Sequence, residues 1–417
     1  MVRRFQLIVI AAILLIAAFS TSLSFLFYLV YLAILVIGGS YILTRLGLAD
    51  LEAGYAVNQL TGHVGDRLQI TYTLRNTSRI PKPWLEVHNP TTLPGGLPGR
   101  ALTLGSSAER SWLVRAPLTR RGHFRVEPLQ IRTGDPFGFF EASASVGQGV
   151  AVVVYPKVDV LPLWRLPAAS IEGSHAAPER TLQTSPLATA VRPYAPGDAM
   201  NRIHWKSTAR HGDIQVKEFE LEQTADAWIF LDLDRSVQGG RGEDSTVEVA
   251  VRAAASIAAK ALLENRAVGM TVNGHRQATV PVDRGSRQHL KIMQLLAAVD
   301  GDGTTPFAEC LVSSAGRLRR GMTAVVITAS TDTAWVRPLA AFRAKGIGSV
   351  VITLDGPAAD RYDRELRARA GDRVAQPDPA TLEHQAQRAR ALRHALAEYE
   401  LKVHPLVPGR RLPELLG

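Results

Sequence analysis

Two aspartates separated by one residue follow an apolar run in the second half of the chain. The run Ala227-Trp-Ile-Phe-Leu leads into Asp232-Leu-Asp234. An apolar run of this length is typical of a strand buried on both faces, so the aspartates would lie in the loop at its carboxyl end. Alternate residues of such a loop direct oxygens to one point, and oxygen ligands suit Mg²⁺, Mn²⁺ or Ca²⁺. A second loop, Gly301-Asp-Gly-Thr-Thr305, offers hydroxyls.

The elements expected to position these residues alternate between strands and helices. Strands are predicted at 227–234, 267–274, 323–330 and 348–355, and helices at 246–265, 287–299, 307–319 and 337–346. Alternation of this kind predicts a doubly wound, mostly parallel α/β sheet of Rossmann-like type. Ligands bind such sheets outside the carboxyl ends of the strands, at the switch point. A basic amphipathic helix over 380–400 is expected to pack on this domain, which we delimit as 226–417.

The segment from Asp232 to Ser236 resembles a variant of the Asp-x-Ser-x-Ser metal motif of von Willebrand A domains. The resemblance implies that Asp232 and Ser236 keep the family's residue type, that Asp234 replaces the first serine, and that Thr304 is the counterpart of a threonine from a later loop. The family's third element ends in Thr-Asp-Gly, but here the strand ends Thr-Ala329-Ser. Two hypotheses follow: Asp234 replaces the missing carboxylate and a divalent cation binds, or the metal is lost and the fold serves as a scaffold.

A basic segment, residues 191–225, precedes the first strand of this domain. Pro196-Gly197 suits the central positions of a type II turn. A helix over 201–210 would place three cations on one face, Arg202, Lys206 and Arg210. Like charges at that spacing need an acidic partner. The candidates within the chain are Asp232, Asp234, Glu218, Glu220 and Glu222, and the candidates outside it are a partner protein or a phosphate.

This segment is similar to the signature of a bacterial family called domain of unknown function 58. The matching residues are Arg192, Tyr194, Gly197, Asp198, Ile203, Trp205, Ala209 and Arg210. The stretch RGHFRVEPLQIRTGDPFGFF, from Arg121, resembles the family's other hallmark. The resemblance implies membrane-linked proteins with a von Willebrand A-like domain, frequently associated with MoxR-type AAA+ ATPases, which would be the partner. In the alternative interpretation the signature residues fold a clamp that fixes the linker to the sheet.

The N-terminal region, residues 1–48, predicts a transmembrane helical hairpin. Residues 5–41 contain no Asp, Glu, Lys or Arg, and this run is nearly twice the ~20 residues that cross a bilayer core. Ser20-Thr-Ser22 near its middle would form the turn. Arg3, Arg4 and Arg45 then lie on one side, which the positive-inside rule places in the cytoplasm. We therefore expect an inner (plasma) membrane protein with two spans and cytoplasmic soluble domains.

Between the hairpin and the basic segment the sequence predicts a small β domain and a linker. Period-two alternation and frequent Pro and Gly turns over 52–155 indicate an antiparallel β-sandwich. The stretch from Gly134 to Phe140 (GDPFGFF) is interpreted as a docking corner between domains. Residues 156–190 are rich in Pro, Ala and Ser and predict a linker or an extended covering segment.

Composition and missing motifs limit the function. A single cysteine, Cys310, excludes a disulfide framework within one chain and a cysteine-based zinc site. The sequence contains no phosphate loop, no G-x-S-x-G elbow and no H-E-x-x-H motif. We therefore predict a non-enzymatic, membrane-tethered interaction scaffold. The alternatives are a metal-dependent hydrolase using Asp232 and Asp234, and nucleic-acid binding through the basic surface, since the net charge is +10. An aromatic content of 6% and the lack of a recognised binding module argue against nucleic acid.

Overall fold

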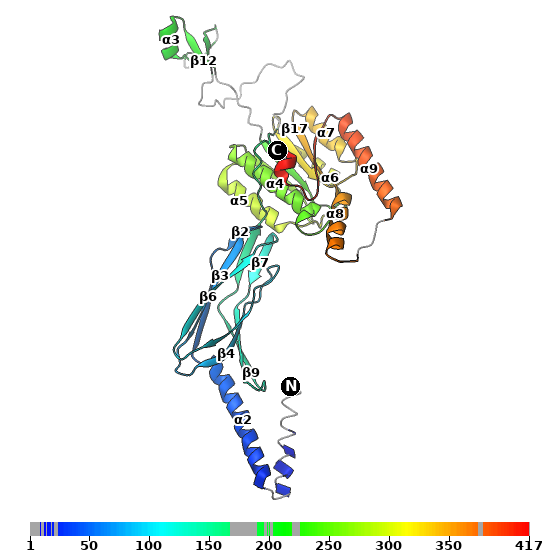
Figure 1. Ribbon diagram of the computed structural model, residues 1–417. Coiled ribbons are helices and arrows are strands. Elements are labelled where there is room, and N and C mark those ends of the chain that lie inside the picture. The colour runs from blue at the N-terminus through cyan, green and yellow to red at the C-terminus, as the bar shows by residue number, and fades with distance from the viewer. Residues whose placement is uncertain are drawn as a thin grey trace. The chain divides into compact units, whose positions relative to one another are not determined.

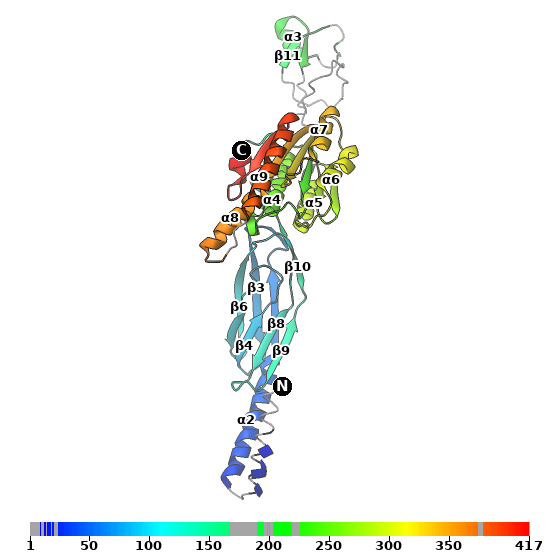
Figure 2. The ribbon, with the colours of Figure 1, turned by 90° about the vertical axis from the view of Figure 1, so that its right-hand side faces the viewer.

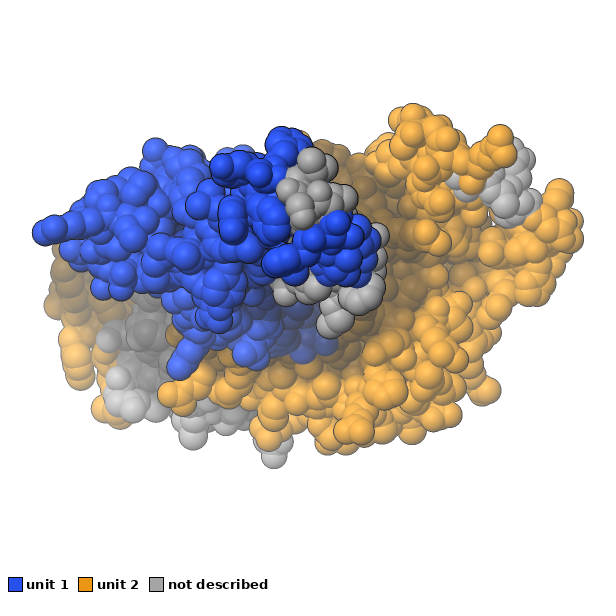
Figure 3. Space-filling model, turned by 90° about the horizontal axis from the view of Figure 1, so that it is seen from below, with its two compact units in different colours: residues 1–157, 296–298 blue, residues 158–295, 299–417 orange. Residues whose placement is uncertain are grey.

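The structure is a computed structural model that divides into two compact units. It describes residues 9, 12–13, 15–17, 19–20, 24–166, 190–195, 198, 200, 203–218, 226–373 and 378–416. One unit contains residues 1–157 and 296–298, and the other contains residues 158–295 and 299–417. Figure 3 shows the two units in different colours. Each unit is described by itself.

The first unit begins with an apolar helix, α2 (Ser24–Leu48). Among the described residues it is the one helix long and apolar enough to cross a membrane, a profile that membrane anchors share with signal sequences. The first predicted span falls largely outside the described residues. Those that are described, at 9, 12–13, 15–17 and 19–20, have helical conformation, and the ring of Phe19 meets Phe27 edge-on at 5.3 Å.

The carboxyl end of α2 is built into the β part of this unit. Small residues at Ser40, Thr44 and Gly47 form its buried face. A Cβ added at Gly47 would lie 2.7 Å from the side chain of Thr133, so only glycine permits this approach. The ammonium of Lys82 donates to the carbonyl oxygens of Leu46 and, at 2.8 Å, Ala49. These carbonyls lie at the helix end, where no partner within the helix remains for them, so Lys82 caps α2.

Ten strands follow α2: β1 (Leu51–Val57), β2 (Thr61–His63), β3 (Arg67–Asn76), β4 (Lys82–His88), β5 (Arg100–Leu104), β6 (Glu109–Pro117), β7 (Gly122–Val126), β8 (Leu129–Gly134), β9 (Glu141–Val146) and β10 (Val150–Tyr155). They form sheets of order β1-β3-β6, β2-β10-β7 and β5-β4-β8-β9 around one apolar core (Figure 1). The predicted β-rich region is therefore present. The pair β2–β10 is parallel, which differs from the wholly antiparallel expectation.

The GDPFGFF stretch was interpreted as a docking corner between domains, and it packs against α2, at the boundary of the predicted regions 1–48 and 52–155. Residues 135–140 form the turn between β8 and β9, inside the first unit. The phenyl ring of Phe140 meets Tyr41 of α2 edge-on at 5.6 Å. The Asp-Pro step thus makes a local turn, and its aromatic residues pack beside the helix of the same unit.

The second unit contains a six-stranded sheet of order β15-β14-β13-β16-β17-β18. Its strands are β13 (Ala227–Asp232), β14 (Val268–Asn273), β15 (Gln277–Asp283), β16 (Thr323–Thr328), β17 (Gly348–Leu354) and β18 (Lys402–Leu406). The neighbours are parallel except for the edge strand β15, which is antiparallel to β14. Every residue of β13, β14 and β16 is buried, as apolar runs flanked by helices require.

Helices cover both faces of this sheet. They are α4 (Thr246–Leu263), α5 (Gly285–Ala298), α6 (Phe307–Ser314), α7 (Val336–Ala344), α8 (Gly356–Arg369) and α9 (Pro379–Glu398), followed by α10 (Leu412–Leu416). Trp228 and Phe230 of β13 pack in one cluster with residues of α6, α7 and α9. The alanine-rich α4 contacts β13, β14 and β16 but takes no part in that cluster, so it covers the opposite face. The mixed α/β expectation is confirmed.

Residues 158–166 pack on the α/β unit instead of forming a free linker. The amide of Asp159 donates to Ser256 Oγ of α4 at 2.9 Å, and its carboxylate pairs with Arg252 at 3.4 Å. Trp164 is buried and meets the ring of His404 edge-on. The first part of the predicted linker is therefore a covering segment, while residues 167–189 lie outside the described residues.

A small hairpin and one helix make up the described part of the basic segment. Strand β11 (Ala190–Pro193) pairs antiparallel with β12 (Gln215–Glu218), and α3 (Trp205–His211) lies between them in sequence (Figure 2). The helix is shorter than the expected 201–210 because His204 acts as its N-cap. The His204 Nδ1 accepts the amide hydrogen of Ser207 at 3.1 Å.

Candidate functional site

Asp232, the last residue of β13, is the centre of the predicted site and is 1% exposed. The hydroxyl of Thr328 donates to its Oδ2 at 2.6 Å. The amide of Asn273 and the backbone N–H of Asp234 donate to Oδ1 at 3.3 and 3.2 Å. Thr328 ends β16 and Asn273 ends β14, the two strands on either side of β13. The site thus lies at the carboxyl ends of adjacent parallel strands, where the sequence placed it.

Burial controls the protonation of this carboxyl group. It raises the pKa of Asp232 from 3.8 to about 6, although the hydrogen bonds from Thr328, Asp234 and Asn273 lower it, and the Asp234 carboxylate adds a further upward push. The three donors are neutral groups. They satisfy the oxygens of Asp232 without compensating the full cost of removing a charge from water.

Asp234 and Ser236 form a local turn with each other. Both the backbone N–H and the hydroxyl of Ser236 donate to Asp234 Oδ1 at 2.9 Å, as in the turns that aspartate favours. The backbone of Asp234 pairs with Gly303 of the second predicted loop. A Cβ at Gly303 would lie 2.8 Å from the carbonyl oxygen of Asn273, which only glycine avoids. The two loops therefore run side by side, with Thr304 exposed next to them.

These residues, as arranged, do not fit a tightly held divalent cation. Both oxygens of Asp232 accept hydrogen bonds, and Asp234 uses Oδ1 twice within its own turn. Among the described residues there is no group of three or more His, Cys, Asp or Glu side chains placed to hold a metal. A cation ligated by Asp232, Asp234, Ser236 and Thr304 would compete with the hydrogen bonds that Thr328 and Ser236 donate.

Among the described residues, one buried polar atom of this cluster lacks a hydrogen-bond partner, and it belongs to Asn273. Its Nδ2 donates to Asp232 and, at 2.9 Å, to the carbonyl oxygen of Thr305. Turning the amide over would place its oxygen against these two acceptors, so its orientation is fixed. Its Oδ1 is buried without a hydrogen-bond partner in the described part of the chain, and such an atom costs stability.

In the basic segment, Arg192 and Asp198 form a two-pronged ion pair. Nη1 and Nη2 of Arg192 donate to the two carboxylate oxygens of Asp198, each at 2.8 Å. Asp198 Oδ2 also accepts the N–H of Ala195 at 2.9 Å, so the pair closes the turn between them. The amide of Tyr194 donates to the carbonyl of Ile214. This ion pair is local to the segment, so a clamp that fixes the linker to the sheet stays a prediction, and Gly197 and Arg202 lie outside the described residues.

Large apolar and basic side chains of the same segment face solvent. Trp205 is 68% exposed, and Met200 is exposed to the same extent. Lys206 and Arg210, one helical turn apart on α3, are exposed as well. In contrast, Ile203 and Val216 are buried and pair across the segment. Of the apolar signature residues Ile203 and Trp205, Ile203 packs inside the segment, whereas Trp205 does not.

The carboxylates of Asp232 and Asp198 each take their hydrogen bonds from within their own cluster. Asp232 takes its hydrogen bonds from Thr328, Asn273 and Asp234, and Arg192 pairs with Asp198. That Asp232 or Asp234 meets the cations of the basic segment stays a prediction. Sequence reasoning missed Thr328 and Asn273. Both are polar residues at the ends of otherwise apolar runs, and that position was the available signal.

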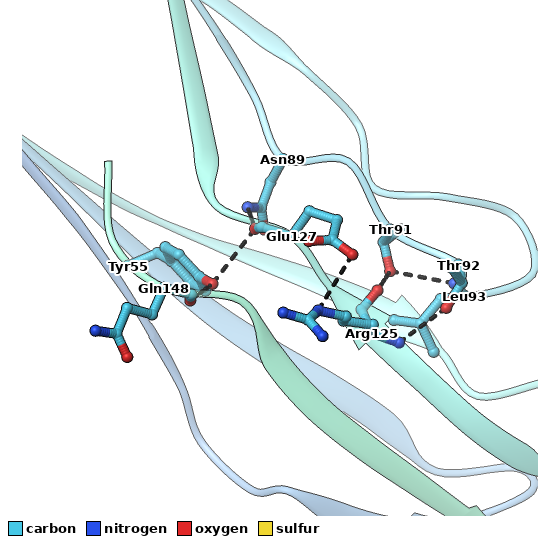
Figure 4. Close-up of polar contacts among 8 residues, drawn as sticks. All are labelled: Tyr55, Asn89, Thr91, Thr92, Leu93, Arg125, Glu127 and Gln148. Atoms are coloured by element: carbon cyan, nitrogen blue, oxygen red, sulfur yellow. Dashed lines mark hydrogen bonds and ion pairs between the residues drawn. The ribbon is translucent and has the colours of Figure 1, made fainter. Parts of the chain in front are cut away.

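A second polar cluster lies in the β part of the first unit (Figure 4). The hydroxyl of Tyr55 donates to the carbonyl of Gln148 at 2.6 Å, and Asn89 donates to the carbonyl of Glu127 at 2.6 Å. Arg125 pairs with the Glu127 carboxylate at 3.2 Å. Most acceptors here are backbone carbonyls, so the cluster ties neighbouring strands and loops together.

Sequence comparison places the second half of the chain in a known family. Residues 190–400 match the family described as "Protein of unknown function DUF58". The uncharacterized protein YeaD of Bacillus subtilis is 25% identical over 271 residues, which cover 63% of this chain and 65% of that protein. The uncharacterized protein Mb1516 of Mycobacterium bovis is 28% identical over 160 residues, 37% of this chain and 50% of that protein. The chain thus spans less than two thirds of the length of either relative.

Solved structures resemble only limited parts of the chain. The CARDB domain of the PF1109 protein from Pyrococcus furiosus is 15% identical, covers 25% of this chain and 92% of that one, and has a TM-score of 0.19. Proximal thread matrix protein 1 from the mussel byssus is 12% identical, covers 31% of this chain and 37% of that one, and has a TM-score of 0.24. Likenesses this weak carry no functional information.

Proposed function

Since this chain belongs to the DUF58 family of proteins of unknown function, we propose that it is a membrane-tethered, non-enzymatic scaffold that binds a protein partner through its basic segment. The observation that carries this proposal is the exposure of Trp205 beside Lys206 and Arg210. Tryptophan and arginine are the residues most enriched at the energetic centres of protein interfaces. Basic side chains around them would steer an acidic partner surface.

The basic segment has a defined structure, which supports a role in binding. The Arg192–Asp198 pair and the buried Ile203–Val216 pair hold the short helix α3 against its hairpin. A side chain displayed on an ordered element loses little entropy on binding. Exposing a tryptophan on such an element costs stability unless a partner covers it. The basic segment therefore combines order with unburied apolar surface, which is the combination that recognition requires.

The α/β unit serves as the platform in this proposal. Its sheet order, with a single antiparallel edge strand, and the Asp232 cluster at the end of β13 support a von Willebrand A-like fold. We infer that the Asp232 cluster is structural and holds no tightly bound divalent cation, because its oxygens are engaged by Thr328, Asn273 and the Asp234 amide. This interpretation disfavours the metal-dependent hydrolase that the two aspartates had suggested.

The tether is the apolar N-terminal region. We propose that residues 1–48 form two membrane spans, which is supported by the helical conformation of the described residues before Phe19 and by the contact of Phe19 with Phe27. Arg45 in the last turn of α2 supports an orientation with the soluble units in the cytoplasm, at the inner face of the plasma membrane. The partner that the family resemblance implies is a MoxR-type AAA+ ATPase.

The test is direct binding between the full chain in lipid nanodiscs and the purified MoxR-type ATPase of the same organism. Trp205→Ala is expected to weaken binding about tenfold or more, as for a central interface residue. Leu263→Ala, which removes another exposed apolar side chain, serves as the matched control and is expected to bind as wild type does. Nucleic acid would instead give affinity that falls steeply with salt.

Two outcomes would overturn the proposal. One is the absence of binding by the wild-type chain. The other is a Trp205→Ala variant that binds normally but unfolds at a lower temperature. The second result would mean that the tryptophan packs on the chain's own α/β unit, as the clamp hypothesis requires.

A further inference from the structure

The turn between β8 and β9 is folded so that it presents one exposed phenyl ring, Phe137, beside a half-buried one, Phe139. Asp135 is buried and accepts the amide hydrogens of Phe140 at 2.6 Å and Phe137 at 2.9 Å. Gly138 has a φ of +71° and donates to the Asp135 carbonyl. This turn keeps Phe137 out of the core. Phe137 is 59% exposed, and its ring stacks on the ring of Phe139, with centroids 5.6 Å apart.

The same turn contacts the end of α2. The ring of Phe140 meets Tyr41 edge-on at 5.6 Å, and the Phe140 carbonyl accepts the Thr44 hydroxyl at 3.5 Å. Figures 1 and 2 both show β9 reaching the end of the β unit that joins α2. The turn therefore lies at the level of Tyr41 and Thr44 along the helix.

The length of α2 places that level at a membrane boundary. The helix has 25 residues, and about 20 are enough to cross the hydrocarbon core. Counted from Ser24, the core ends near Leu43. Tyr41 and Arg45 bracket this position, with the guanidinium of Arg45 5.7 Å from the centre of the Tyr41 ring. Tyrosine and arginine are typical of residues at the membrane–water interface.

Other exposed apolar side chains lie at this end of the β unit. A Cβ added at Gly134, the residue before the turn, would lie 3.3 Å from the ring of Trp84, so that indole packs beside the turn. Trp84 is partly exposed. Tryptophan, like tyrosine, concentrates at the level of the lipid headgroups, because one edge of its ring is apolar and the other donates a hydrogen bond.

We propose that the turn 135–140 is a second membrane contact, in which Phe137 and Phe139 enter the interfacial layer of the bilayer beside α2. The inference rests on the proposed membrane insertion of α2. A stacked phenyl pair held next to the lipid boundary gains by leaving water, and the hydrogen bonds of Asp135 keep its backbone satisfied while it does so. With two points of contact the β unit is fixed in tilt and rotation relative to the bilayer, which a single helix does not achieve.

The experiment measures the depth of the turn in the full chain. Phe137→Cys is labelled with the environment-sensitive dye nitrobenzoxadiazole and reconstituted in vesicles of phosphatidylethanolamine and phosphatidylglycerol. Wild type is the labelling control, because Cys310 is buried. Lipids with a doxyl quencher just below the glycerol are expected to remove roughly half of the emission, because interfacial side chains lie about 5–10 Å deep. Adding Phe139→Ser is expected to reduce the quenching.

Two further labelled positions separate the possible failures. Gln148→Cys, exposed in the β9–β10 turn at the other end of β9, is expected to show no quenching, and Leu35→Cys, exposed in the middle of α2, is expected to be quenched strongly. Quenching at Leu35→Cys without quenching at Phe137→Cys would overturn this inference and leave the tether intact. Absence of quenching at both positions would overturn the membrane tether itself. A dye at Phe137→Cys whose emission indicates an apolar environment in detergent as well as in vesicles would mean that protein covers the turn.

Discussion

In the Asp232 cluster and in the basic segment, both oxygens of a carboxylate accept hydrogen bonds, but the donors differ. Asp232 is buried and receives a hydroxyl, a side-chain amide and a backbone amide. Asp198, partly open to solvent, receives both arms of the Arg192 guanidinium. Neutral donors satisfy geometry but leave the charge of Asp232 poorly compensated, so its pKa rises to about 6. A charged donor compensates Asp198 directly. The first arrangement makes a packed platform, and the second orders an exposed element.

The largest predicted effect is the loss of the hydroxyl at Thr328. Thr328→Val leaves Asp232 with one oxygen unsatisfied in a buried site, which is expected to cost about 3–4 kcal/mol at pH 8. The cost is smaller at pH 5, where the carboxyl is protonated. Hydrogen exchange of the β13 and β16 amides measures it locally. Thr353→Val, in register with Thr328 on β17, is the matched control. Equal effects of the two variants would show that Asp232 does not depend on this hydroxyl.

The next prediction concerns the charge of Asp232 itself. Its folded pKa of about 6 lies above the unfolded value of 3.8, so the folded state binds more protons in that window. Its contribution to stability therefore falls as pH rises from about 4 to about 6 and then stays level. Asp232→Asn removes this dependence and is expected to be more stable than wild type at pH 8, by on the order of 2–3 kcal/mol. Urea unfolding at pH 5 and pH 8 checks the sign. A variant less stable at pH 8 would contradict it.

A smaller effect is expected at the other carboxylate. Arg192→Lys keeps the charge but loses one of the two arms that bind Asp198, which should weaken the segment by about 1 kcal/mol. Faster amide exchange in β11 and α3 would report the change. Arg284→Lys, where the guanidinium reaches Asp226 through one nitrogen at 3.1 Å, provides the control and should change exchange less. Equal changes in amide exchange for the two replacements would show that the two-armed geometry of Arg192 adds no stability.

The smallest expected effect is that of added Mg²⁺. Because the Asp232 oxygens are engaged by protein donors, millimolar Mg²⁺ should shift the melting temperature of wild type and of Asp232→Ala by less than about 1 °C each. Differential scanning calorimetry provides the comparison. A clear rise in melting temperature that occurs only in wild type would restore the metal-binding hypothesis. The Asp232 cluster would then be a binding site and not a packed platform.

The sequence predicted the buried elements and missed those at the periphery. Strands β13, β14 and β16 are continuous apolar runs, and burial on both faces makes that signal strong. The edge strands β15 and β18 were missed. They contain Pro281 and Pro405, residues that occur at sheet edges and weaken a strand pattern. Helix α8 was missed because its sequence is mostly polar and contains few apolar residues.

At the candidate site, too, only residues next to a strong local pattern could be predicted. Asp232 and Asp234 were predicted because they directly follow a recognisable strand, and the Gly301–Thr305 loop lies beside them as expected. The partners of Asp232 could not be predicted in the same way. Thr328 meets Asp232 only because β16 lies next to β13 in the sheet, and the order of strands is a property of the whole fold. The local pattern marks Thr328 and Asn273 as polar ends of apolar runs, but it does not say which strands are neighbours.

The capping of α2 by Lys82 has a consequence for how the protein is made. The ammonium is buried and its pKa is lowered by desolvation, against an upward pull from Asp50. Leu46 and Ala49 supply acceptors for it. Loss of residues 24–49 would take those carbonyls away and leave the buried ammonium without these two acceptors. During synthesis, the helix end likewise stays unfinished until β4 has emerged from the ribosome and folded back. The end of α2 and the β unit are thus completed together, through one lysine.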